Sequence, residues 1–557
     1  MQKVSSQQAI DTNIQAKKWW EREAEVQQDH EKGKNKWKAL EHHGVTFFPA
    51  YQPHGGKPMD LTPEQEEICN WWAQIVDQDF SKKPLVRKNF EKSFIELFDQ
   101  YLSDYKEIRK NRSTQEKKKE IEEKQKQDLI YKYCLIDGEL EKISNIIVEP
   151  PGIFRGRGEH PLAGKLKSRI MPEHVTVNVG PEDPIPACPL GGHSWKRIIS
   201  NPEATWLCHF KDERLEKSNN GKYVQLAADS RIKGENDRKK YEKARRLKKN
   251  IDSIKRNYQE KMRSQDVVDQ QLGVCTYLID KLALRVGNEK GEDEADTVGC
   301  CSLKVKNIQI EENNQITLDF LGKDSIRYLN TVEVEAKVHQ NLKSFVQGKN
   351  PDDELFDRIN ASKLNDYLKE MMDDLSAKVF RTYNASVTLQ NQFQEKDNKI
   401  SEIDTIEKKV QFYEECNREV ARLCNHQKEA NKNHDEQLLK MKQVQTEKQE
   451  KVTQLEQELA KLKKGKSSND PKLPKTVDLC LTALEKARAQ LELQEMRVKK
   501  KDENKNLALG TSKINYMDPR ISISWCKQKE VPIEKIFQPT LMNKFTWAMN
   551  IEPDYEF

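Results

Sequence analysis

The chain has 557 residues, enough for three or four domains with cores of their own. Charged residues make up 34% and hydrophobic residues only 35%, so we expect much of the chain to be solvated helix. No apolar run approaches the roughly 18 residues of a membrane span, and the N-terminus lacks the apolar stretch of a signal peptide. These features exclude a miniature binding module and a membrane protein, and predict a soluble intracellular protein.

Net charge and cysteine usage further limit the classes of protein to which the chain can belong. The 96 basic and 91 acidic residues leave a net charge of only +5, a balance that can hide local segregation of charge. Eleven cysteines occur without a C-x-x-C pair. This pattern favours a reducing compartment over a disulfide scaffold or a structural zinc site.

The N-terminal part predicts an arm followed by a folded domain. Residues 1–35 are polar and are expected to form a disordered or loosely docked arm. From Trp37 aromatic residues mix with Pro and Gly, as in a packed irregular or β region, and residues 61–80 predict a helix that begins near Pro63. Residues 113–128 are charged with hardly any apolar face, which is typical of an exposed helical connector.

A loop rich in Gly and Pro follows at residues 148–161. It places Arg155 and Arg157 where the backbone can approach a ligand closely. Two arginines on such a loop suit phosphates or base edges, and an ordinary surface turn remains the alternative. Residues 166–230 contain the strand-like pieces VTVNV, TWLCHF and KYVQLA, which predict a mainly β part that closes a first lobe.

Two helices are expected next. Residues 231–263 hold 14 basic and 5 acidic side chains, a local charge of +9, which favours a surface for a polyanion over an ordinary solvated face. Apolar residues at helical spacing then predict a core helix that ends near Gly287. Arg285 lies at that end, where an arginine usually complements the helix dipole.

Three further basic residues stand in recognisable segments. The alternating pattern of residues 316–328 predicts a β-hairpin with Lys323 and Asp324 at its tip, where a lysine ordinarily faces solvent. Arg381 lies in AKVFRTYNAS, and the amphipathic helix VQFYEECNREVARLCNHQ carries His426 at its end. A lone histidine at a helix end is usually only a dipole partner.

Residues 428–505 have two narrow apolar seams, which predict an antiparallel two-helix coiled coil that protrudes from the body. Its turn would be fixed by Gly465, Pro471 and Pro474. The seams consist of Leu438, Met441, Val444, Val452, Leu455, Leu459 and Leu462 in the first helix and of Val477, Leu484, Leu491 and Val498 in the second.

The stretch LALGTSKINYMDPR, residues 507–520, places Tyr516 between two helix breaks. Such breaks predict that the phenol is presented on a short exposed segment, where a tyrosine can act as a nucleophile. Taken alone, an ordinary aromatic residue is the simpler interpretation, because a phenol with a pKa near 10 reacts only in surroundings built for it.

Read together, these segments resemble the eukaryotic type IB DNA topoisomerases. The resemblance extends from Trp37 to Phe557 and rests on the order of Arg285, Lys323, Arg381, His426 and Tyr516, with a coiled coil before the tyrosine. It also rests on longer words: LALRVGNEK, ADTVGCCSL, FLGKDSIRY, AKVFRTYNAS, LCNHQ, LGTSKINYMDPR and the closing DYEF.

The resemblance implies an α+β multidomain fold. A two-lobed DNA clamp would combine a mixed α/β cap lobe with a mainly helical catalytic lobe of the tyrosine recombinase and type IB topoisomerase kind, and a protruding coiled-coil linker. The implied divisions are an arm at 1–35, a DNA-clamping cap and core lobe at 36–230, a catalytic core domain at 231–429, a linker at 430–505 and a C-terminal domain with the tyrosine at 506–557.

The resemblance also implies an activity: relaxation of supercoiled DNA through a transient 3′-phosphotyrosine, without ATP or a required metal. Tyr516 would attack the phosphodiester, Arg285, Arg381 and His426 would stabilise the charge that grows on phosphorus, and Lys323 would protonate the leaving 5′-oxygen.

Further implied residues contact duplex DNA, largely without sequence preference. They are Arg109, Arg157, Lys222, Lys240, Asn288, Lys290, Thr297, Asp324, Asn365, Lys378 and Asn515. In the family Arg157, Asp324 and Asn515 also line the pocket for camptothecin-class inhibitors, so sensitivity to these compounds is expected. The resemblance implies a monomer with neither cofactor nor membrane association.

The sequence departs from the usual pattern of the family in two places. Nuclear members usually carry a long lysine-rich tail, whereas here the KWKALEH region begins after 36 residues. A nuclear location is expected, with a mitochondrial form as the alternative. The cap near QPHGGKPMDL is shorter than in relatives.

Two other functions are alternatives. A tyrosine recombinase shares the catalytic residue types but usually lacks the coiled coil, and a non-enzymatic coiled-coil DNA-binding scaffold is the alternative from another class.

Overall fold

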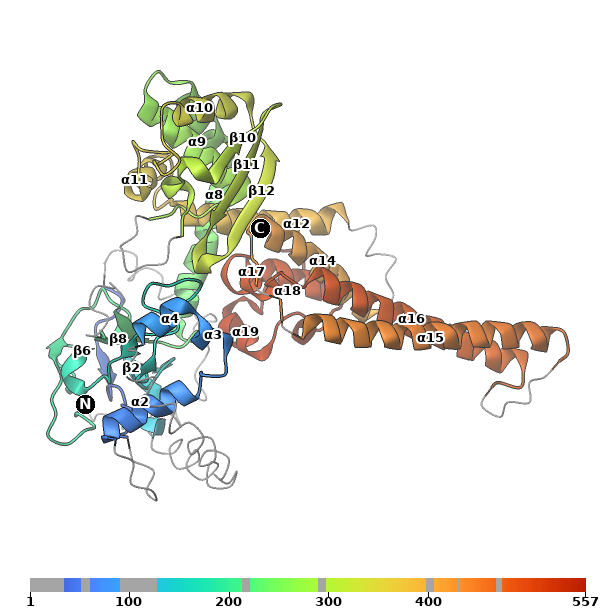
Figure 1. The fold of residues 1–557 in the computed structure, drawn as a ribbon, viewed down its shortest axis with the longest axis horizontal. Coiled ribbons are helices and arrows are strands. Elements are labelled where there is room, and N and C mark those ends of the chain that lie inside the picture. Colours follow the sequence, from blue (N-terminus) through green and yellow to red (C-terminus); the bar gives the residue numbers. More distant parts are fainter. Residues whose placement is uncertain are drawn as a thin grey trace. The chain divides into compact units, whose positions relative to one another are not determined.

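The computed structural model describes residues 35–51, 61–90, 128–212, 221–288, 297–396, 405–428, 430–431, 433–466 and 473–557, whose fold is drawn in Figure 1. The chain divides into two compact units. The first comprises Met1–Tyr277, Arg285–Val379 and Pro532–Glu552, and the second Leu278–Leu284, Phe380–Val531 and Pro553–Phe557. Nearly all of the expected connector, of the expected N-terminal arm and of the shortened cap segment lies outside the described residues.

The described residues in the N-terminal part of the first unit form three small sheets, and the three strand-like pieces predicted there are confirmed as β6, β8 and β9. In the four-stranded sheet β7–β6–β8–β9 only the β6–β7 pair is parallel. These strands are Arg197–Ile199 (β7), Val175–Asn178 (β6), Trp206–Phe210 (β8) and Lys222–Gln225 (β9). The antiparallel sheet β1–β2–β3 is formed by Leu40–His42, Tyr133–Ile136 and Glu139–Lys142, and β4 (Gly152–Ile153) pairs with β5 (Leu166–Lys167).

Two hydrophobic clusters hold this part together. The larger joins alternating residues of the two larger sheets and includes Trp37, Val175 and Leu207. The smaller is centred on Trp72 of α2 (Pro63–Ala73), whose ring stacks on Phe90 with centroids 4.4 Å apart. The predicted helix start at Pro63 is confirmed because Thr62 and Gln65 form a capping box, although the predicted helix is split into α2 and the short α3 (Asp79–Lys82); α4 (Pro84–Asn89) follows.

The basic helix predicted at residues 231–263 is confirmed as α8 (Arg231–Arg263). Ser230 caps it by accepting a hydrogen bond from the backbone N–H of Lys233. Residues such as Tyr241, Leu247 and Ile254 recur at helical spacing on its buried face, so the basic side chains gather on the remaining surface.

The predicted β-hairpin is also confirmed. Strand β11 (Gln315–Leu321) pairs with β12 (Arg327–Glu333), and β10 (Ile308–Ile310) completes an antiparallel sheet. The further helices of the first unit are α9 (Val267–Leu282, whose last residues belong to the second unit), α10 (Ala336–Val346), α11 (Ala361–Met371) and α19 (Pro539–Lys544).

The described part of the second unit is mainly helical. Its helices are α12 (Ala377–Glu395, which begins in the first unit), α14 (Ile406–Leu423), α15 (His434–Lys463), α16 (Val477–Glu503), α17 (Leu509–Asn515) and α18 (Pro519–Gln528). Trp525 of α18 stacks on Phe393 of α12, with centroids 5.2 Å apart, and on Phe412 of α14, at 6.3 Å. These rings join the three helices α12, α14 and α18. Among the described residues of both units, no helix is long and apolar enough to cross a membrane.

Helices α15 and α16 lie side by side (Figure 1), as the two seams predicted. Their direction is antiparallel, because Gln494 donates to Met441 O at 2.8 Å while Arg488 reaches Glu456 at 2.6 Å. Several seam residues are buried between them, whereas Val444 is 39% exposed. Of the residues expected to fix the turn, Gly465 has φ +73° and Pro471 lies outside the described residues.

We expect Leu484→Ala to loosen this helix pair by about 2–5 kcal/mol, because Leu484 is only 4% exposed and its loss leaves a cavity. Hydrogen exchange should show faster exchange of the α15 and α16 amides. Leu481→Ala is the matched control, because Leu481 lies on the same helix but is 38% exposed. Equal exchange in the two variants would contradict the packing.

Candidate active site

Tyr516 lies in the break between two helices, as the turn residues predicted. Its backbone N–H donates to Ser512 O at 3.0 Å to close α17, and Asp518 caps the start of α18. The phenol side chain is only 6% exposed, so the prediction of an exposed segment is wrong. The ring stacks on the imidazole of His426, with centroids 5.1 Å apart and planes inclined by 23°. This contact helps to bury a ring that the local sequence alone would leave in solvent.

Arg381 lies with its guanidinium over the Tyr516 ring. It projects from α12, is 5% exposed, and its guanidinium carbon is 4.8 Å from the centroid of the Tyr516 ring. Its terminal nitrogens donate to the carbonyl oxygens of Ala283 and Cys424, the latter at 3.0 Å. The buried Nε–H has no hydrogen-bond acceptor in the described part of the chain. An always charged group with an uncommitted donor is prepared for an anion.

The contacts of His426 define the state of its ring. Nε2 lies 3.3 Å from an Arg381 nitrogen and Nδ1 lies 2.7 Å from Ser512 Oγ. Because a guanidinium can only donate, Nε2 must accept, so the neutral ring carries its proton on Nδ1 and donates it to the serine hydroxyl. His426 could donate from Nε2 to an anion only after a second protonation or a change of tautomer. As predicted it follows a helix, lying three residues beyond the end of α14.

Arg285 belongs to the first unit and lies in an irregular segment. The predicted helix does not reach Gly287, because α9 ends at Leu282 and the next residue, Ala283, has φ +49° in the left-handed region. The carbonyl oxygen of Arg285 accepts from the backbone N–H of Cys300 at 2.8 Å. This bond requires two backbone segments to approach closely.

Lys323 and Asp324 occupy the tip of the β11–β12 hairpin, as predicted, and both are exposed. Asp324 has φ +66°, in the left-handed region, and its carboxylate pairs with the guanidinium of Arg157. The neighbouring Gly158 has no room for a side chain, because an added Cβ would lie 2.3 Å from Ser325 Cβ. The glycine-rich loop and the hairpin tip therefore meet within the first unit.

The five predicted catalytic residues divide between the two units. The structure brings Arg381, His426 and Tyr516 together in the second unit, while Arg285 and Lys323 belong to the first.

The other predicted contacts differ in exposure. Arg109 and Lys290 lie outside the described residues. Exposed side chains are those of Arg157, Lys222, Asn288, Asp324, Lys378 and Asn515, and the half-buried ones are those of Lys240, Thr297 and Asn365.

Two of the half-buried residues already have structural contacts. Asn365 donates to Ala361 O at 2.8 Å and accepts from the first N–H of α12 at 3.1 Å. Lys240 pairs with Asp237 at 3.1 Å, and burial lowers the pKa of its ammonium group while Asp237 acts in the opposite direction. Contact with an external phosphate would compete with these bonds.

Sequence reasoning missed the residues that hold the site in place. Ser512 orients His426, and Ser386 of α12 donates to the carbonyl oxygen of Tyr516 at 3.3 Å. The turn signal at Ser512 was visible, but its partner lies 86 residues away. No local signal distinguishes Ser386 from an ordinary helical serine.

Comparison with known proteins gives the class to which this fold and site belong. Models of two eukaryotic DNA topoisomerase I regions match the chain: the DNA binding fragment over residues 35–101 and 96–226, and the catalytic core over residues 229–459. A model of the C-terminal topoisomerase domain matches residues 488–557.

Individual relatives indicate the same family as these models. The chain is 45% identical to DNA topoisomerase 1 beta of Arabidopsis thaliana over 94% of its own length and 60% of that protein. It is 42% identical to DNA topoisomerase 1 of Caenorhabditis elegans, covering 93% of this chain and 67% of that protein, and 42% identical to DNA topoisomerase 1 of Homo sapiens, covering 94% and 72%. The chain therefore belongs to the eukaryotic DNA topoisomerase I family. It spans about 60% of the length of the two Arabidopsis relatives.

The Arg285 segment yields a test of its packing. A Cβ on Gly299 would lie 2.4 Å from Gly287 N and 2.8 Å from Arg285 O, so Gly299→Ala should push the segments apart and destabilise the first unit by about 1–3 kcal/mol. Chemical denaturation measures the loss. Gly191→Ala is the control, because nothing lies within 4 Å of a Cβ there. Equal stability of the two variants would contradict the close approach.

Proposed function

We propose that the chain is a type IB DNA topoisomerase, which relaxes supercoiled duplex DNA by cutting one strand, allowing it to rotate and resealing it, without ATP or a required metal ion. The observation that carries the proposal is the Arg381 guanidinium, buried against the Tyr516 ring with an uncommitted Nε–H. A fixed cation with a free donor beside a phenol suits a phosphodiester that the phenol oxygen attacks.

In the proposed reaction the Tyr516 oxygen attacks phosphorus. The phenol loses its proton to solvent as its oxygen bonds to phosphorus. The bond to the 5′-oxygen breaks, which leaves a 3′-phosphotyrosine and, once that oxygen is protonated, a free 5′-hydroxyl. One phosphoester replaces another, so the energy needed for resealing is retained and ATP is not consumed. Lys323, exposed at its hairpin tip, supplies the proton for the departing 5′-oxygen.

Charge grows on the non-bridging oxygens as phosphorus becomes five-coordinate. Arg381 can donate its Nε–H to one of these oxygens, and Arg285 can hold an oxygen with a planar fork of donors. His426 would add a hydrogen bond from Nε2, which requires that nitrogen to carry a proton. The proposal therefore requires DNA binding to change the Arg381–His426 contact seen at 3.3 Å. It also requires Arg285 and Lys323 to reach the same phosphodiester.

The proposed partner is double-stranded DNA, bound by the monomer mainly through phosphates. The named lysines, arginines and amides would position the duplex, so sequence preference should be weak and affinity should fall steeply with salt.

We infer the divisions 36–230 for the cap and core lobe, 231–429 for the catalytic core, 430–505 for the linker and 506–557 for the C-terminal domain. The pair α15–α16 would then be a protruding linker of a two-lobed clamp. A nuclear location suits an enzyme of chromosomal DNA, with a mitochondrial form as the alternative.

Tyr516→Phe tests the central step. The variant lacks the attacking oxygen, so relaxation of a supercoiled plasmid in EDTA without ATP should disappear, together with the covalent protein–DNA adduct. Its DNA affinity should match that of the parent, which serves as the control for folding. Persistent relaxation would reject the proposal, and activity that depended on paired recombination sites would favour a tyrosine recombinase.

Lys323→Ala tests the proton donor. Strand cleavage should slow by roughly 10²–10⁴-fold, the usual contribution of a general acid. A substrate with sulfur in place of the 5′-bridging oxygen should restore most of the rate, because a thiolate leaves without a proton. Single-turnover cleavage measures both. Equal slowing on the oxygen and sulfur substrates would assign Lys323 another role.

The Arg157–Asp324 pair bears on inhibition by camptothecin-class compounds, which should slow resealing by the parent protein. Arg157→Ala should weaken this effect about tenfold or more, since a hydrogen bond to a charged group contributes about 1.5–3 kcal/mol. Resealing in the presence of the drug is the measurement. Arg155→Ala is the control: this exposed arginine on the same loop lies 5.9 Å from the Phe80 ring. Unchanged resealing in the parent would refute the inhibitor proposal.

A further inference from the structure

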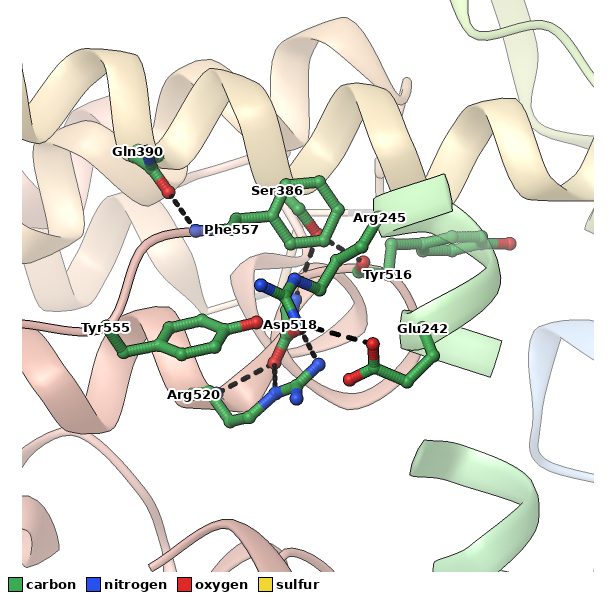
Figure 2. Close-up of polar contacts among 9 residues, drawn as sticks. All are labelled: Glu242, Arg245, Ser386, Gln390, Tyr516, Asp518, Arg520, Tyr555 and Phe557. Atoms are coloured by element: carbon green, nitrogen blue, oxygen red, sulfur yellow. Dashed lines mark hydrogen bonds and ion pairs between the residues drawn. The ribbon is translucent and has the colours of Figure 1, made fainter. Parts of the chain in front are cut away.

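A buried carboxylate lies two residues after the nucleophile candidate. Asp518 is 0% exposed, and both of its oxygens accept charged hydrogen bonds from Arg520: Oδ1 from Nε at 3.1 Å and Oδ2 from Nη2 at 2.8 Å. Oδ1 also caps α18 by accepting from the backbone N–H of Arg520 at 2.9 Å. The fourth donor is the hydroxyl of Tyr555, 3.1 Å from Oδ2 (Figure 2).

The donor Tyr555 comes from the last five residues, Pro553–Phe557, which belong to the second unit although the residues before them belong to the first. Three further contacts hold this tail. Ser524 Oγ of α18 donates to Pro553 O at 2.6 Å, the Arg520 guanidinium lies 4.8 Å from the centroid of the Tyr555 ring, and the Phe557 N–H donates to Gln390 Oε1 of α12 at 2.7 Å. Phe557 itself is 4% exposed.

Ser386 connects this network to Tyr516. Its hydroxyl oxygen accepts from the backbone N–H of Asp518 at 3.0 Å, and its O–H donates to the carbonyl oxygen of Tyr516 at 3.3 Å. Ser386 is 0% exposed and lies on α12, five residues after Arg381. The backbone that directly follows Tyr516 is thereby tied to the helix that carries the arginine, as Figure 2 shows for Ser386.

From these contacts we propose that the C-terminal segment Pro553–Phe557 is a positioning element for Tyr516, acting through Tyr555, Asp518 and Ser386. The inference rests on the proposed function. Asp518 fixes the start of α18, and Ser386 fixes the peptide units between Asp518 and Tyr516. The Tyr555 hydroxyl donates to Oδ2 of the carboxylate, the same oxygen that accepts from Arg520 Nη2. The segment touches no DNA in this scheme and is not catalytic.

The Asp518 network is expected to affect the position of Tyr516 more than the stability of the fold. A buried ion pair such as Asp518–Arg520 is weak evidence for stability, since desolvation opposes the attraction between the charges. Geometry is more demanding: a nucleophile must lie within about 3–3.5 Å of its target, and a displacement of about 1 Å can cost on the order of 10²-fold in rate. A network that fixes the backbone at Tyr516 acts on that requirement.

The test is Tyr555→Phe, which removes one hydroxyl and keeps the ring. We expect both cleavage and resealing in single turnovers to slow by about tenfold or more, because Tyr516 is the attacking group in one direction and the leaving group in the other. The equilibrium fraction of covalent adduct, the Kd for DNA and Tm should stay close to parental values. A purely structural contact would lower Tm and leave the rates of the folded fraction unchanged.

Tyr413→Phe is the matched control. Tyr413 is also buried in the second unit, and its hydroxyl lies 2.7 Å from Ser522 Oγ, away from the Asp518 carboxylate. This variant should cleave at the parental rate. Equal slowing of both variants would overturn the positioning role, and so would a parental rate for Tyr555→Phe.

Asp518→Asn, alone and combined with Tyr555→Phe, completes a double-mutant cycle. If the hydroxyl acts through the carboxylate, the double variant should be little slower than Asp518→Asn alone. Independent, multiplicative effects would overturn the proposed route. Failure of the parent protein to form any adduct would instead refute the proposed function, so the two failures are distinguishable.

Discussion

The candidate site depends on how the fold buries the charge of Arg381. Removing a guanidinium from water costs several kcal/mol unless its hydrogens are used, and here the carbonyl oxygens of Ala283 and Cys424 accept from both terminal nitrogens. These acceptors lie 98 and 43 residues away in the sequence, so one side chain joins three separate segments. Carbonyl dipoles satisfy the hydrogen bonds without cancelling the charge. The arginine therefore retains its attraction for an anion while its position is fixed.

The geometry of the other two groups follows from that arginine. His426 accepts from it at Nε2 and donates a hydrogen bond from Nδ1–H to Ser512 Oγ, and the Tyr516 ring lies against both the imidazole and the guanidinium. Helix α12 supplies Arg381 on one turn and Ser386 further along, so the same rigid element sets the place of the cation and of the tyrosine backbone. A helix is well suited to this task because its spacing does not vary.

The first unit presents its candidate groups differently. Lys323 stands at an exposed hairpin tip beside the Arg157–Asp324 pair, and the Arg285 segment is held by close backbone contact with Gly299. Lys323 is thus exposed on a turn, whereas the backbone at Arg285 is fixed by packing. That contrast agrees with the roles proposed for them, because a proton donor must reach a leaving oxygen while a charge-stabilising arginine must stay in place.

Hydrophobic periodicity and turn chemistry determined the bounds of α8, the hairpin with Lys323 at its tip and the paired seams of α15 and α16, because these features depend on neighbours within a few residues. The order of five reactive residue types indicated the chemistry. Only the tertiary structure decided that Tyr516 is buried, that α9 ends at Leu282 and that Ser386 is hydrogen-bonded to the backbone of Tyr516 and Asp518. Those outcomes arise from contacts between segments up to 132 residues apart, and the local sequence does not indicate which distant side chain will complete a hydrogen bond.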